Sequence, residues 1–173
     1  DQDFFRLSGV GRDCYLYARE KKRIEDIRVR VDLDEAYRDA DLTVELFTKG
    51  KIQVALSLRD AAGREVASAS TNGGSVTMKV ENPLKWSAET PNLYTLYASA
   101  GSETIPVKVG FRELEIRDAQ VLVNGQPVLF KGADRHELDP DKGYAVSEAL
   151  MTQDIKIMKQ FNINAVRTCH YPD

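Results

Sequence analysis

Both histidines of the chain lie in polar segments that directly follow short apolar runs. His136 follows the run VLFKGAD (128–134), and His170 follows the run AVRT, which contains Arg167. A neutral imidazole both donates and accepts hydrogen bonds, which suits ligands rich in hydroxyl groups, such as sugars. An arginine can hydrogen-bond a carboxylate and keep it ionised. These residues are therefore the first candidates for a binding site.

The elements around these residues predict that they meet at one edge. Residues 147–161 have a helical pattern, with Ser147 as a cap and Lys159 in the last turn. The apolar stripe of this helix consists of Leu150, Met151, Ile155, Met158 and Phe161. A strand, a helix and a strand without a reverse turn predict two parallel strands, as at the start of a (β/α)8 barrel. Ligands bind at the carboxyl ends of such strands, where both histidines would lie.

Position alone leaves other interpretations open. A histidine near a strand end is often structural, and Arg135 with Glu137 can form a local ion pair. A nucleophilic pair of Cys169 and His170 is disfavoured, because adjacent residues of a strand point to opposite faces. Trp86 can stack on a sugar, but a packing role is favoured. The sequence contains no phosphate-binding loop, metal-ligand cluster or nucleophile elbow.

The first two thirds of the chain have the pattern of an antiparallel β-sandwich. Apolar and polar residues alternate in short runs separated by Gly, Asn and Asp, over a length that suits an immunoglobulin-like module. The runs are IRVRVDL (27–33), LTVELF (42–47), VALSLRD (54–60), VASAS (66–70), SVTMKV (75–80), LYTLYAS (93–99) and IPVKVG (105–110). Within VLVNGQPVLFKG (121–132), Asn124-Gly125 predicts a tight β-hairpin.

Composition limits the classes of function. The chain has 173 residues and a net charge of −3, so it has no basic excess for nucleic acid. No apolar run approaches the ~20 residues of a membrane span. No signal peptide is evident, although the chain begins without a methionine, and two distant cysteines suggest neither a disulfide framework nor a zinc motif. The compartment stays open between cytoplasm and periplasm.

Three blocks of the sequence resemble glycoside hydrolase family 2, most closely its bacterial β-galactosidases. They are DQDFFRLSGVGRDCYLYA (1–18), ENPLKWSAETPNLYTL (81–96) with VGFRELEIRDAQVLVNGQPVLFKGADRHELDPDKG (109–143), and DIKIMKQFNINAVRTCHYPD (154–173). The resemblance implies three parts. Residues 1–19 would end a sugar-binding jelly roll, 20–117 would be the immunoglobulin-like β-sandwich, and 118–173 the truncated start of the (β/α)8 barrel. The expected fold class is thus mainly β, with a first βαβ portion of the barrel.

The resemblance also implies roles for individual residues. Asp3 matches an aspartate that binds galactose and a sodium ion, and His136 and His170 match histidines that contact galactosyl hydroxyls. Arg167 matches the arginine beside the nucleophilic glutamate. The family's acid/base and nucleophilic glutamates would lie beyond residue 173, so this chain alone is expected to be inactive. The parent protein is expected to use Mg²⁺ and Na⁺, to hydrolyse β-galactosides with retention, and to form a homo-oligomer.

Two alternatives to the β-galactosidase remain. One is another member of the same family, a β-glucuronidase or β-mannosidase. The other is a non-catalytic sandwich that binds carbohydrate or supports a barrel, since no row of aromatic residues marks a sugar platform in residues 20–117. Partners other than the sugar and the rest of the parent chain, such as nucleic acid or a membrane, are not expected. The barrel part is expected to expose strand edges and the apolar stripe of its helix.

Overall fold

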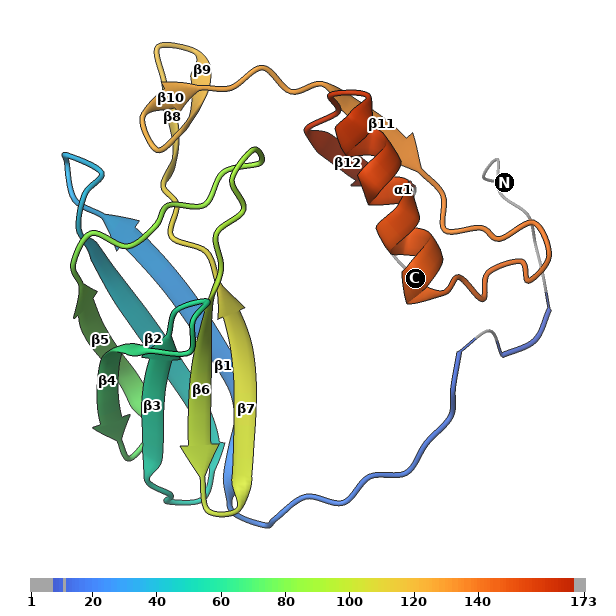
Figure 1. Cartoon of the computed structure of the whole chain (residues 1–173). Helices are drawn as coiled ribbons and strands as arrows, with labels where there is room; N and C mark the ends of the chain where they lie inside the picture. The colour runs from blue at the N-terminus through green and yellow to red at the C-terminus, as the bar shows by residue number, and fades with distance from the viewer. Residues whose placement is uncertain (1–7, 11, 170–173) are drawn as a thin grey trace. The chain divides into compact units, whose positions relative to one another are not determined.

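The computed structural model describes residues 8–10 and 12–169. The chain forms two compact units, one spanning Ala18–Val128 and the other combining the described residues up to Tyr17 with those from Leu129 onward. The first unit is a β-sandwich with an appended hairpin, and the second is a strand–helix–strand unit (Figure 1). We call them the sandwich unit and the βαβ unit. The fold is mainly β, as predicted.

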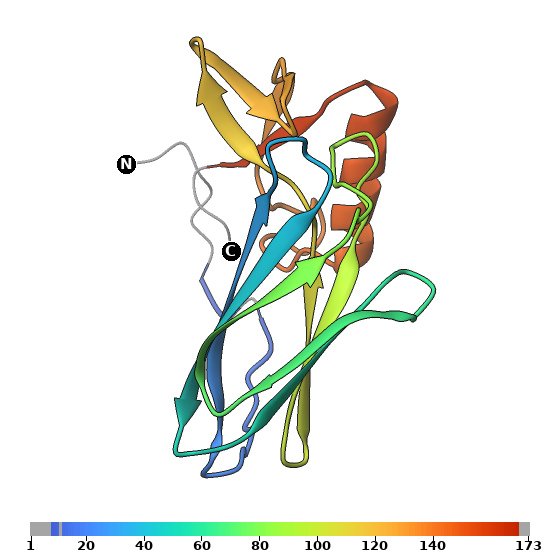
Figure 2. The same cartoon turned by 90° about the vertical axis from the view of Figure 1, so that its left-hand side faces the viewer.

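The sandwich consists of two antiparallel sheets. One contains β1 (Arg23–Leu33), β2 (Ala40–Lys49) and β5 (Gly74–Val80), in that order. The other has the order β4 (Glu65–Thr71), β3 (Val54–Arg59), β6 (Tyr94–Ala100) and β7 (Glu103–Val109). The seven strands coincide closely with the alternating runs of the sequence, and the two layers face each other across one core (Figure 2).

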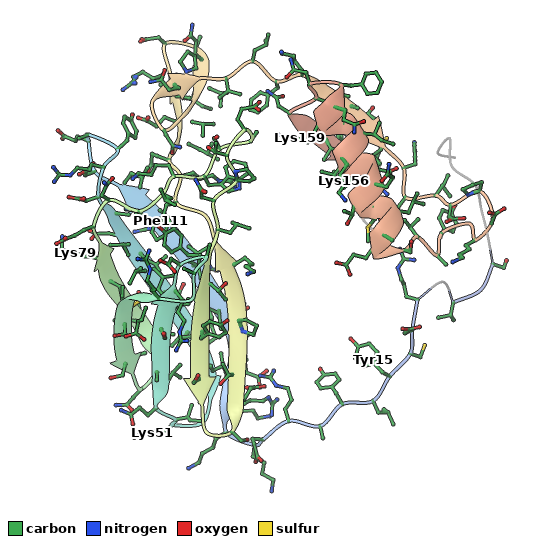
Figure 3. All side chains as sticks on the ribbon, in the orientation of Figure 1. Tyr15, Lys51, Lys79, Phe111, Lys156 and Lys159 are labelled. Carbon is green, nitrogen blue, oxygen red and sulfur yellow. The ribbon has the colours of Figure 1, made fainter. Side chains whose placement is uncertain are left out.

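Alternation along the strands produces this core. From Ala40 to Leu46 in β2, and throughout β6, every second residue is buried, because successive side chains of a strand point to opposite faces. Phe111, which follows β7, is completely buried inside the sandwich (Figure 3). Its ring meets that of Tyr94 edge to face, at 5.0 Å between centroids and 88° between planes. The buried residues are Ile24, Ala40, Leu42, Val44, Leu46, Val54, Leu56, Leu58, Met78, Val80, Tyr94, Leu96, Ala98, Ala100, Val109 and Phe111.

A small three-stranded sheet follows the sandwich, formed by β8 (Leu114–Arg117), β9 (Gln120–Val123) and β10 (Gln126–Pro127). Asn124 and Gly125 connect β9 to β10 with φ angles of 51° and 74°, as a two-residue hairpin turn requires. The predicted hairpin is thus present. A Cβ atom on Gly125 would lie 2.6 Å from Cε2 of Tyr37, so the site also needs glycine for space.

Asn124 connects this hairpin to the sandwich. Its Oδ1 accepts a hydrogen bond from the amide of Glu113 at 2.9 Å, and its Nδ2 donates to the carbonyl of Trp86 at 3.1 Å. Trp86 is half-buried, and the guanidinium of Arg112 lies 4.5 Å from its ring centroid. A Cβ on Gly110 would lie 3.1 Å from the Trp86 side chain. Trp86 therefore has a packing role here, in line with the favoured interpretation.

The βαβ unit contains β11 (Gly132–Arg135), α1 (Glu148–Gln160) and β12 (Ala165–Thr168). β11 and β12 pair in parallel, from Gly132 with Ala165 to Arg135 with Thr168, which confirms the predicted parallel pair. The predicted cap is also present, since the Ser147 side chain accepts a hydrogen bond from the amide of Leu150 at 3.2 Å. No helix of the described residues is long and apolar enough to cross a membrane.

The first barrel strand begins later than the sequence predicts. The apolar run from residue 128 was expected to start it, but β11 begins at Gly132, and Leu129 and Phe130 are exposed. The loop before β12 explains this difference. The Asn164 side chain accepts from the amide of Lys131 at 2.8 Å and donates to the carbonyl of Leu129 at 2.9 Å, so these backbone groups bond a side chain instead of a strand.

The helix α1 has one partly covered face and buries none of its residues. Leu150, Met151 and Met158 of the predicted stripe are half-buried, whereas Ile155 and Phe161 are exposed by 45% and 75%. On the solvent-facing side of the helix, Lys156 and Lys159 are exposed (Figure 3). The stripe is therefore only partly covered by the described residues.

Candidate functional site

The rim at the carboxyl ends of β11 and β12 brings together part of the predicted site. Asp134 is in register with Arg167, and Arg135 with Thr168. The ladder extends one step further, because the amide of Cys169 donates to the carbonyl of Arg135 at 3.0 Å. His136 thus follows the last ladder bond of β11, and is half-buried. His170 and Asp3 lie outside the described residues, so their predicted roles stay predictions.

The two faces of the parallel pair carry different groups. Arg135 contacts Asp154 on α1, so its side chain is on the helix-facing side. By alternation, Asp134 and Arg167 are on the opposite face. There Nη1 of Arg167 lies 3.7 Å from Oδ1 of Asp134 and donates to Sγ of Cys169 at 3.1 Å. In a closed (β/α)8 barrel the helices are outside, so this second face would point into the barrel.

The Arg167 side chain is open to ligands in the described structure. It is 59% exposed and Asp134 is 63% exposed, so their ion pair contributes little to stability. Both residues line an open hollow of about 350 Å³. The remaining lining residues are Gly132, Ala133, Ala165 and Val166. The hollow therefore presents one guanidinium and one carboxylate between small and apolar residues, which suits a polar ligand or another carboxylate.

A denser group of charges lies on the helix side. Nε and Nη2 of Arg135 lie 2.9 and 2.8 Å from Oδ2 of Asp154, and Nη1 lies 3.5 Å from Oε1 of Glu137. The ion pair of Arg135 and Glu137 considered from the sequence is therefore present. Asp154 was not foreseen as its partner. One feature of the sequence could have indicated this contact. Asp154 lies four positions after Leu150, so it is on the same, partly covered side of the helix.

The loop after β11 is held by further polar contacts. Nη2 of Arg12 lies 3.9 Å from Oε2 of Glu137, and Nη1 of the same guanidinium donates to the carbonyl of Tyr144. Asp139 accepts hydrogen bonds from the amides of Asp141 and Lys142 at 2.8 and 3.0 Å, which forms a tight turn. Glu137 therefore interacts with two arginines and is only 15% exposed. It has the environment of a structural carboxylate.

The described residues supply groups for binding and positioning. Hydrolysis of a glycosidic bond with retention needs two carboxyl groups about 5–5.5 Å apart on either side of that bond. Glu137 is occupied by ion pairs with Arg12 and Arg135. Among residues 8–10 and 12–169, no group of three or more His, Cys, Asp or Glu could hold a metal ion. The Mg²⁺ and Na⁺ expected for the parent protein therefore stay predictions, and Asp3, the residue assigned to sodium, lies outside the described residues.

Relatives and solved structures are similar to the chain over nearly its whole length. A curated β-galactosidase of Actinobacillus pleuropneumoniae is 42% identical over 100% of this chain and 17% of its own length. That of Streptococcus thermophilus is 44% identical over 100% of this chain and 18% of its own. The chain thus spans about a fifth of the length of these relatives.

Among solved structures, a β-glucuronidase from Ruminococcus gnavus superimposes with a TM-score of 0.79 at 28% identity, covering 88% of this chain and 26% of its own. A β-glucuronidase of an uncultured Clostridium superimposes with a TM-score of 0.78 at 30% identity, over 88% of this chain and 26% of the β-glucuronidase chain. Residues 22–112 match the family described as glycosyl hydrolases family 2, and residues 114–173 match the TIM barrel domain of that family. The chain belongs to glycoside hydrolase family 2.

Proposed function

We propose that this chain is part of a retaining β-galactosidase that hydrolyses terminal β-D-galactosides. One observation carries the proposal: the curated relatives named β-galactosidase are similar over all of the chain, at 42 and 44% identity, including the rim segment after β11 and β12. Since the chain spans about a fifth of their length, most of the enzyme would be supplied by other segments. The rim would contribute to recognition of the sugar.

The roles proposed for the rim residues follow from their chemistry. His136 and His170 would hydrogen-bond galactosyl hydroxyls, and Arg167 would keep the nucleophilic carboxylate ionised. The exposed position of Arg167, on the face opposite α1, supports its role. One carboxylic acid would protonate the leaving oxygen while a second carboxylate attacks the anomeric carbon, and water would then release the sugar. This pair is expected after residue 173, so we expect the 173-residue chain alone to be inactive.

A β-glucuronidase is the second candidate, because the similar solved structures described above carry that name. The two activities differ in one chemical requirement. A glucuronidase must recognise the carboxylate of its sugar, and a basic residue is the natural partner of that group. The predicted galactosidase needs no such residue, and the greater identity to the curated β-galactosidases favours it.

Hydrolysis of nitrophenyl β-D-galactoside and β-D-glucuronide by the full-length protein distinguishes the two candidates. Turnover of the galactoside with little glucuronide hydrolysis would support the proposal. A preference for the glucuronide would refute the proposed substrate without changing the family. No activity on either substrate would refute both candidate activities. The 173-residue chain, assayed in parallel, should release no nitrophenol above the rate of a buffer blank.

Further features of the enzyme are proposed on the resemblance alone. Asp3 would contact both the sugar and a sodium ion, and Mg²⁺ would also bind in the complete enzyme. The complete enzyme would be a homo-oligomer, located in the cytoplasm or the periplasm of a bacterium. Dialysis against a chelator, followed by readdition of Mg²⁺ or Na⁺ in an assay of the full-length protein, tests the metal dependence.

A further inference from the structure

We propose that Arg135 is a positioning residue that holds His136 at the rim by binding Asp154 and Glu137 at the same time. The inference rests on the proposed function, because His136 is assigned there to sugar binding. It concerns a residue that would not touch the sugar itself. We call Arg135, Glu137 and Asp154 the Arg135 cluster.

The contacts of Arg135 fix its side chain on the helix-facing side of β11. Two nitrogens of the guanidinium reach the same oxygen of Asp154, at 2.8 and 2.9 Å, and the third lies 3.5 Å from Glu137. The Arg135 side chain is 10% exposed and that of Glu137 15%, so water competes little for these groups. A lysine would keep the charge and lose the planar fork that makes three contacts possible.

The backbone of Arg135 is fixed from the other direction. Its carbonyl accepts the last hydrogen bond of the parallel ladder, from the amide of Cys169 at 3.0 Å. Arg135 therefore joins α1 through its side chain and the end of β12 through its backbone. Arg135 is also the last residue of β11, and His136 is the next residue in the chain.

His136 thus lies in the chain between the two partners of one ion pair, Arg135 and Glu137. Arg135 precedes it and Glu137 follows it, and Arg12 adds a second contact to Glu137 at 3.9 Å. Arg135 is the last residue of β11, and side chains alternate along a strand, so fixing Arg135 towards α1 would direct the next side chain away from the helix. Arg167 lies on that side of the parallel pair, so in this proposal the cluster sets the direction of the His136 imidazole.

Misplacing a binding group by about 1 Å can cost about 100-fold in rate. We therefore expect Arg135→Lys in the full-length enzyme to lower kcat/KM for nitrophenyl β-galactoside by about 10- to 100-fold. Asp154→Asn removes the other side of the same contact and should give a loss of similar size. Arg64→Lys is the matched control, because Arg64 also binds an aspartate, Asp60, through Nε and Nη2 at 2.8 and 2.7 Å. It should leave kcat/KM unchanged.

A double-mutant cycle with His136→Ala distinguishes positioning from general damage. If Arg135 acts through His136, Arg135→Lys should cause almost no additional loss of kcat/KM in the His136→Ala background. A full additional loss in that background, or no loss in the single variant, would overturn the proposal.

Hydrogen exchange separates this inference from the proposed function. In the same full-length variants, the segment 131–138 should exchange faster in Arg135→Lys than in wild type, whereas Arg64→Lys should leave it unchanged. If the wild type hydrolyses neither glycoside, the proposed function fails, and the exchange rates still decide whether the cluster holds this segment. Unchanged exchange in Arg135→Lys would overturn the inference even if the wild-type enzyme is active.

Discussion

The sandwich unit and the βαβ unit differ in how much of their own apolar surface they cover. The sandwich buries sixteen residues in one cluster, whereas no residue of α1 is buried. Both units follow the hydrophobic periodicity expected of their elements, so local pattern does not explain the difference. Two facing sheets bury each other, but two parallel strands and one helix have only one contact layer. The comparison teaches that correct secondary structure does not ensure a complete core.

The contrast has a functional counterpart. The sandwich is built from apolar contacts, and the charged groups considered as site residues belong to the βαβ unit. The Arg135 cluster ties α1 to β11 through ion pairs, in a unit that has little apolar burial. Polar contacts of this kind fix direction well, but contribute less to stability than a closed core. The βαβ unit thus has a defined geometry with modest intrinsic stability.

The largest expected effect is in hydrogen exchange of the 173-residue chain. Amides of β2 and β6 should exchange only through global unfolding, which for a domain costs about 5–15 kcal/mol. Amides of α1 should exchange through local opening of much lower free energy, since the helix buries no side chain. Mass spectrometry of peptic peptides at a concentration where the chain is monomeric measures both. Equal protection of α1 and β6 would contradict the expected difference in stability between the two units.

The same substitution in the two units gives the next largest contrast. Phe111→Ala should lower the free energy of unfolding by about 3–5 kcal/mol, because Phe111 is fully buried against Tyr94. Phe161→Ala, at a position that is 75% exposed, should change it by less than about 0.5 kcal/mol. Urea unfolding followed by fluorescence of Trp86, the single tryptophan, reports on the sandwich unit. Similar losses in both variants would contradict the assigned core.

A pair of glycines tests how the hairpin is joined to the sandwich. Gly63 and Gly125 have φ angles of 79° and 74°, so alanine at either position costs about 1–2 kcal/mol in backbone strain. A Cβ on Gly63 meets nothing within 4 Å, but on Gly125 it meets the ring of Tyr37. Gly125→Ala should therefore destabilise the sandwich unit by about 1–3 kcal/mol more than Gly63→Ala. Thermal unfolding of the two variants measures this difference, and equal losses would show that the Tyr37 contact is dispensable.

Sequence reasoning predicted the elements whose signals are local. Period-two alternation identified the sandwich strands, Asn124-Gly125 the hairpin, and Ser147 the start of α1. Each of these patterns is contained within a few neighbouring residues. The late start of β11 could not be predicted in this way, because it depends on hydrogen bonds from Asn164, which is 33 residues away from Lys131.

The candidate site was predictable in position and less so in contacts. The strand–helix–strand order placed His136 and Arg167 at one edge, since parallel strands share their carboxyl ends. The pairing of Arg135 with Asp154 spans 19 residues and two kinds of element, so no spacing rule indicates it. The position of Asp154 beside the apolar stripe of the helix is a signal of such a partner, although a weaker one than a fixed spacing would be. The predicted roles of Asp3 and His170 concern residues outside the described part.

Acid provides the mildest test of what holds the sandwich together. Both guanidinium contacts from Arg19 to the carboxylate of Glu103 are 2.8 Å long, and this hydrogen bonding holds the pKa of Glu103 below its ordinary value of 4.5. The Arg38 side chain likewise lowers the pKa of Asp39 below 3.8. Because these carboxyl groups have a lower pKa in the folded protein than in the unfolded chain, the unfolded chain binds more protons than the folded protein at acidic pH. The associated stability is therefore present at neutral pH and is lost as pH falls below about 4.5, through the folded pKa.

This prediction can be checked with the urea midpoint of the sandwich unit between pH 7 and pH 3. The midpoint should be steady above about pH 5 and should decline below it. Arg19→Gln removes the partner of Glu103, so its decline should be shallower than that of the wild type, with the two curves converging in acid. Parallel declines would show that Glu103 gains no stability from Arg19. The apolar core, which contains no carboxylate and no histidine, would then account for the stability of the sandwich at this edge as well.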